Sequence, residues 1–139
     1  MIVTSSTLLP AGEDHRIAII VNGSNLQNIS ALDIKNIYTD RVITWNNGNK
    51  IDVYNLPVAA PAREVFSRHI LGLNAQDADI MESNRDIINT NRNRNPHIIK
   101  RDQLIPYIVE KNPNAIAYVR AGSLEDRANI RIIMYLPTE

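Results

Sequence analysis

Residues 17–45 place the strongest constraint on the fold, because they join a buried strand to a helix with a well-marked start. Residues 17–21 are all apolar, too short a run for an independent helix, and are followed by Asn22 and Gly23. Apolar runs of this length are typical of strands that are covered on both faces. The pattern predicts an α/β domain with this strand inside its sheet.

A helix is predicted to begin at Ser30. Ser30 and Asp33 have the spacing of a capping box, in which each side chain accepts a hydrogen bond from the other residue's backbone N–H. Ile29 and Ile34 stand on either side of this start, as in a hydrophobic staple. Trp45, the single tryptophan, follows the helix, and we expect it to be buried beside the next strand.

The rest of the chain alternates between strand and helix patterns. Pro61 fits the first turn of a helix that stops at Gly72, and Pro106 is acceptable in a later helix only within its first turn. The predicted strands are residues 50–56, 115–119 and 130–136, the last at an edge or returning to the sheet, and the predicted helices are residues 61–71, 74–90 and 102–110. The resulting order is β-α-β-α-α-α-β-β around one mixed sheet flanked by helices.

Length and composition favour one domain. The chain has 139 residues, of which 44% are hydrophobic, and it contains no apolar stretch of the ~20 residues needed to span a membrane. We expect residues 16–139 to form a single domain and residues 1–15 to be a flexible segment. The first residues lack the basic and apolar segments of a signal peptide, so an exported form would have lost its signal, and Met1 would not be its native start.

Charge and residue types exclude several classes of function. The formal net charge is zero, which removes the long-range attraction on which general nucleic-acid binding depends. The chain has no cysteine, and its three histidines are not spaced as metal ligands, so we predict neither a metal site nor a cofactor. The sequence also lacks the common nucleophile, phosphate-loop and dinucleotide motifs, so an enzyme is the least favoured class.

Several segments in this order resemble one protein family. They are the strand and Asn turn of IAIIVNGSN, the helix SALDIKNIY, the pair TW, then KIDVYNLP, AREVF and the closing EKNPNAIAYVR. The chain is similar here to the phosphate-binding proteins of ABC-type phosphate transporters, in a short single-lobe branch of the periplasmic-binding-protein-like domains. The resemblance extends over residues 16–120. It implies an α/β periplasmic-binding-protein-like lobe and a periplasmic location.

The resemblance also implies a ligand site at the start of the second helix. The family's loop typically reads Gly-Ser-Gly-Thr before an Arg-Glu pair, and matching this pair to Arg63 and Glu64 places residues 59–62, Ala-Ala-Pro-Ala, at the loop. The hydroxyls are therefore missing, and each charge-assisted hydrogen bond lost to phosphate is worth ~1.5–3 kcal/mol. If a site is retained, the ligand-binding residues implied are Ala60, Ala62, Arg63 and Asn22.

A second candidate site is a basic stretch that could form a surface for an anion or an acidic partner, although such loops are most often simply solvated. Its members are Arg92, Arg94, His97, Lys100 and Arg101, with Arg85 upstream.

Three classes of function remain, in order of preference. The first is a non-catalytic interaction module of the cell envelope, which binds a protein partner or self-associates and keeps a degenerate ligand site. The second is a periplasmic solute-binding protein for phosphate or another oxyanion, which completes its site with a second copy or another chain. The third is an enzyme. Fold alone does not choose among them.

Overall fold

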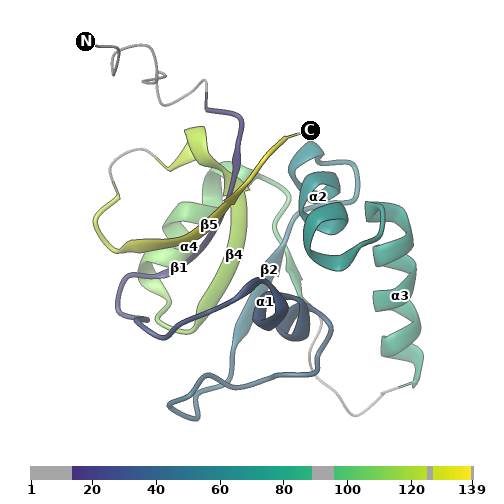
Figure 1. Cartoon of the computed structure of the whole chain (residues 1–139), viewed down its shortest axis with the longest axis horizontal. Coiled ribbons are helices and arrows are strands. Elements are labelled where there is room, and N and C mark those ends of the chain that lie inside the picture. Colours follow the sequence, from purple (N-terminus) through teal and green to yellow (C-terminus); the bar gives the residue numbers. More distant parts are fainter. Residues whose placement is uncertain (1–13, 89–95, 125–126, 139) are drawn as a thin grey trace.

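The computed structural model describes residues 14–88, 96–124 and 127–138, in which five strands form one mixed sheet (Figure 1). The order across the sheet is β3-β2-β4-β1-β5. β2 is parallel to β3 and β4, whereas β1 is antiparallel to β4 and β5. The strands are β1 Ile17–Asn22, β2 Asp52–Asn55, β3 His97–Ile98, β4 Ala115–Arg120 and β5 Ile130–Leu136.

Helices cover both faces of this sheet. Figure 1 shows α4 at the left, partly behind β1 and β5, α1 at the lower centre, and α2 and α3 at the right. Every residue of β1 is buried, which confirms the prediction of a strand covered on both faces. The helices are α1 Ala31–Tyr38, α2 Pro61–Phe66, a π-helical turn η3 Ser67–Leu71, α3 Ala75–Ile88, α4 Ile105–Lys111 and the 3₁₀ turns η4 Asp102–Leu104 and η5 Ala121–Ser123.

Aromatic side chains hold α1 and α2 against the sheet. The ring of Phe66 on α2 stacks on that of Tyr118 on β4, with ring centroids 4.1 Å apart, and lies 4.6 Å from the ring of Tyr38 on α1. Trp45 is also buried, as predicted, and its indole N–H donates to the Asn114 carbonyl at 3.0 Å. The sheet and its helices thus share one apolar core, and the predicted α/β class with a mixed sheet is confirmed.

The predicted start of α1 is confirmed in detail. The Ser30 hydroxyl accepts from the backbone N–H of Asp33 at 3.1 Å, and the Asp33 carboxylate accepts from the N–H of Ser30 at 2.8 Å. Two backbone donors that the helix itself leaves unpaired are satisfied by this exchange.

Replacing Ser30 with alanine should therefore lower the free energy of unfolding by ~1 kcal/mol. The loss comes from one half of the capping box, so Ser30→Asp, which keeps an acceptor at the cap, should lose much less. Urea denaturation of the three proteins measures both differences. Equal midpoints for Ser30→Ala and the parent would show that the cap adds nothing to stability.

Other predicted elements differ from the structure at their ends. β2 is shorter than the predicted strand, and the predicted helix over residues 61–71 ends in the π-helical turn η3, followed by Gly72 at a left-handed φ of 75°. The predicted helix over residues 102–110 divides into η4 and α4, because Pro106 lacks a backbone donor and fits only the first turn of α4.

The strand β3 was not predicted. It has two residues and takes its place only by parallel pairing with β2, with His97 opposite Tyr54. Residues 1–13, which make up most of the predicted flexible segment, lie outside the described residues, so the predicted domain limits stay a prediction. Across the part of the chain that the structure describes, no helix has the length and apolar character needed to cross a membrane.

Candidate ligand-binding site

A pocket of about 680 Å³ lies at one edge of the sheet; we call it the edge pocket. Because β2, β3 and β4 are parallel, their carboxyl ends meet at this edge. Leu56 and Pro57 follow β2, Lys100 comes shortly after β3, and Arg120 ends β4; all four line the pocket. In open α/β sheets, ligands typically bind outside the carboxyl ends of the strands.

One wall of the edge pocket is the loop that leads into α2. Residues 57–60 form a turn in which the Ala60 N–H donates to the Pro57 carbonyl at 2.9 Å. Ala60 is the N-cap of α2 but has no side-chain oxygen for this role, and Pro61 at the next position has no N–H. Among the described residues, the N–H of Ala62 has no hydrogen-bond partner. The loop therefore offers an apolar wall and few donors.

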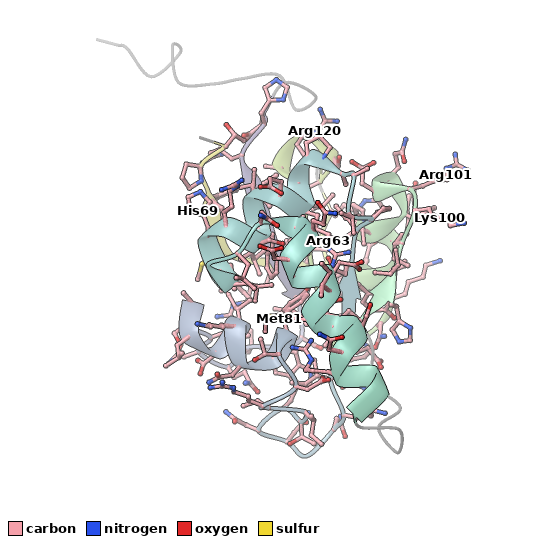
Figure 2. All side chains as sticks on the ribbon, turned by 90° about the vertical axis from the view of Figure 1, so that its right-hand side faces the viewer. Arg63, His69, Met81, Lys100, Arg101 and Arg120 are labelled. Carbon is pink, nitrogen blue, oxygen red and sulfur yellow. The ribbon has the colours of Figure 1, made fainter. Side chains whose placement is uncertain are left out.

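Arg63 does not line the edge pocket. Its side chain is 1% exposed, and its Nη1 donates to the Leu56 carbonyl at 3.0 Å. Its Nη2 lies 3.4 Å from Oε2 of Glu82 and 3.6 Å from Oδ1 of Asp79, both on α3. Figure 2 shows Arg63 in the interior, where α2 meets α3. The guanidinium thus joins α2, α3 and the end of β2.

Asn22 lies away from the edge pocket. It ends β1, which runs antiparallel to β4, so it stands at the opposite edge of the sheet from Arg120. Its side-chain N–H₂ donates to the carbonyls of Val109 and Glu110, at 2.8 and 3.1 Å, and its oxygen accepts from Ser24. Of the four predicted ligand-binding residues, the structure brings only Ala60 and Ala62 together at the pocket, and their role in binding stays a prediction.

The cations of the edge pocket are Lys100 and Arg120. Within the described residues, neither side chain has a hydrogen bond or an ion pair with another residue. Figure 2 shows Arg120 near the top of the molecule and Lys100 at its right side, with Arg101 beside Lys100. His15 and the carboxylate of Asp102 also line the pocket. The lining therefore carries two full positive charges and one negative charge.

A further carboxylate, that of Asp14, is adjacent in sequence to the pocket residue His15. Arg16 donates to it through Nε at 3.0 Å and through Nη2 at 2.8 Å. These hydrogen bonds hold the pKa of Asp14 below its usual range. Asp14 is thus ionised at neutral pH, with its charge balanced by Arg16.

The predicted basic stretch is only partly described. Arg92 and Arg94 lie outside the described residues. His97 is in β3, where its ring lies 5.2 Å from that of Tyr54, and Arg101 precedes η4. Of this stretch, Lys100 is the described member that lines the edge pocket. A shared basic surface stays a prediction. Among the described residues as a whole, His, Asp and Glu side chains form no cluster able to hold a metal ion.

Solved structures resemble this arrangement. An ABC-type phosphate transport receptor from Vibrio cholerae matches 96% of this chain with a TM-score of 0.63 and 15% sequence identity. A putative phosphate ABC transporter substrate-binding protein from Clostridium perfringens, with bound phosphate, matches 87% with a TM-score of 0.57 and 20% identity. The chain has a periplasmic-binding-protein-like fold.

The likeness is one of fold. No protein-family model and no curated protein sequence matches the chain. The chain also spans only about half the length of the two solved structures, 53% and 54%. The periplasmic-binding-protein-like fold thus confirms the architecture that the sequence predicted. The ligand and the partners have to be inferred from the site itself, because fold alone does not determine them.

Proposed function

We propose that this chain is a non-catalytic solute-binding lobe that takes an anionic small molecule in the edge pocket. The observation that carries the proposal is the position of Lys100 and Arg120 at the carboxyl ends of parallel strands, in a pocket and without protein partners among the described residues. Pockets of this size, with apolar walls and a few polar groups, are typical of small-molecule sites. Two cations in the lining of the pocket favour an anion.

The solved structures support the same class of function. Both are named as phosphate transport or substrate-binding proteins, and one contains bound phosphate. By analogy, we propose a location in the bacterial cell envelope, in the periplasm, and a role in solute uptake by an ABC-type transporter. The analogy is one of fold and leaves the choice of anion open.

Binding of an anion should raise the melting temperature. A ligand at 100 times its dissociation constant stabilises the native state by ~2.7 kcal/mol, which moves the melting point of a domain this size by several degrees. We expect such a shift with at least one member of a panel of phosphate, sulfate and organic acids at constant ionic strength. The double variant Lys100→Gln/Arg120→Gln should abolish it.

Arg101→Gln is the matched control, because Arg101 is next to Lys100 but is not among the described residues that line the pocket. The control should keep the full shift. The proposed function is wrong if no anion on the panel raises the melting temperature, or if the double variant shows the same rise as the parent.

A protein-interaction module of the cell envelope is the second candidate. The apolar loop of residues 57–62 favours it, because Val58 and Ala59 are exposed there. On this alternative the same loop contacts a protein partner or a second copy of the chain. Size-exclusion chromatography with light scattering tests self-association, and Val58→Asp should then return the protein to a monomer.

A further inference from the structure

We infer that the edge pocket selects a carboxylate with an apolar body, such as a medium-chain organic acid, and not inorganic phosphate. The inference rests on the proposed function, because it names the ligand class of the same solute-binding site. Three features of the pocket carry it: its size, its apolar wall and its net charge.

The edge pocket has much more room than a small inorganic ion needs. A water molecule takes up about 30 Å³ in the liquid, so a pocket of about 680 Å³ has the room of roughly twenty waters. That volume falls within the range of about 300–1,000 Å³ that is typical of pockets for organic ligands. A phosphate ion bound in the pocket would leave most of this space to water.

Most of the lining is apolar. Ile17, Leu56, Pro57 and Val65 contribute aliphatic surface, and residues 59–62 add three alanines and a proline. Phosphate sites require several donors, yet this loop has no hydroxyl and its Pro61 has no N–H. Apolar surface instead gains from contact with hydrocarbon, at ~0.8 kcal/mol per buried CH₂.

The charges of the pocket match a single negative charge. Lys100 and Arg120 supply two positive charges, and Asp102 takes away one. A carboxylate neutralises the remainder, whereas a phosphate dianion exceeds it and is repelled by Asp102 more strongly than a monoanion is. The lining thus combines a net positive charge with apolar surface.

A series of carboxylates of increasing chain length tests the contribution of the apolar lining to binding. Isothermal titration calorimetry with butyrate, hexanoate and octanoate, each below its micelle concentration, should show binding about fourfold tighter for each added CH₂. Octanol and octylamine should bind more weakly than octanoate, because they lack the charge that Lys100 and Arg120 attract. Inorganic phosphate should bind more weakly than octanoate.

Variants test the charged and the apolar parts of the lining separately. Lys100→Gln/Arg120→Gln should weaken octanoate by at least about tenfold while the ratio between hexanoate and octanoate stays the same. Asp102→Asn should tighten octanoate binding, because it removes a negative charge that repels the carboxylate. Ala59→Asp should weaken octanoate binding strongly. Val58 is its neighbour in the same turn but is not in the described lining, so Val58→Asp should leave octanoate binding unchanged.

The outcomes separate this inference from the proposed function. If phosphate binds and octanoate does not, or if affinity does not rise with chain length, the site is an anion site but the inference is wrong. If octylamine equals octanoate, or Asp102→Asn weakens octanoate, the charge argument is wrong. If none of the anions binds, both the inference and the proposed function are overturned. Circular dichroism of each variant confirms that loss of binding is not loss of fold.

Discussion

Replacing Arg63 with alanine is expected to lower the free energy of unfolding by about 3–5 kcal/mol. The Arg63 side chain is 1% exposed, and its guanidinium bonds to the Leu56 carbonyl and lies within ion-pair distance of Glu82 and Asp79. Alanine removes these contacts and leaves a cavity between α2 and α3. Chemical denaturation monitored by circular dichroism measures the loss.

Arg68 provides a matched control one turn further along. Its side chain is 64% exposed, and its ion pair with Glu64 lies at the surface. Exposed pairs contribute little, so Arg68→Ala should cost at most ~1 kcal/mol. If the two variants have the same midpoint, Arg63 does not hold α2 and α3 together as described.

Arg63→Ala also tests the predicted role of Arg63 in ligand binding. The Leu56 carbonyl that Arg63 holds belongs to a residue of the edge pocket, so Arg63 shapes the pocket through Leu56. If Arg63→Ala keeps its stability but loses anion binding, Arg63 contacts the ligand, as the family resemblance implies. If it loses both, Arg63 acts through the fold.

Local signals made part of the fold predictable. The start of α1 depends on Ser30 and Asp33, three residues apart, so the sequence alone contains both halves of the capping box. β3 has no such local signal. Its two residues are a strand only because β2 lies beside them, and this pairing is not visible in a short polar segment.

The site was less predictable, because its residues meet through long-range strand pairing. Ile17 and Arg120 both line the edge pocket, and the antiparallel register of β1 and β4 places them opposite each other. In the sequence, the only sign that Arg120 lines a pocket is its position at the end of a predicted strand. The family resemblance implied Asn22 as a ligand-binding residue, but β1 runs antiparallel to β4, so Asn22 lies at the opposite edge of the sheet from the pocket.

Raising the pH above about 10 is expected to unfold the protein steeply, through Tyr38 and Tyr118. Burial raises the pKa of both phenols well above the usual value near 10. The folded state keeps these two protons while the unfolded state releases them, so the free energy of unfolding falls as the pH rises. The stability is fully present below the unfolded pKa and is lost as the pH rises through the folded values. Each group lowers the free energy of unfolding by ~1.4 kcal/mol per pH unit, or by about 2.8 kcal/mol for both.

Phenylalanine at position 118 tests this slope, because it keeps the ring that stacks on Phe66 and removes the ionising hydroxyl. The Asn55 side-chain oxygen still accepts from the Leu56 N–H, at 2.9 Å, so the variant should fold. Denaturation midpoints at several alkaline pH values should then show about half the parent's slope. Tyrosinate absorbance should report two of the five tyrosines ionising together with the loss of circular dichroism. If all five ionise while the circular dichroism is unchanged, Tyr38 and Tyr118 are not buried as described.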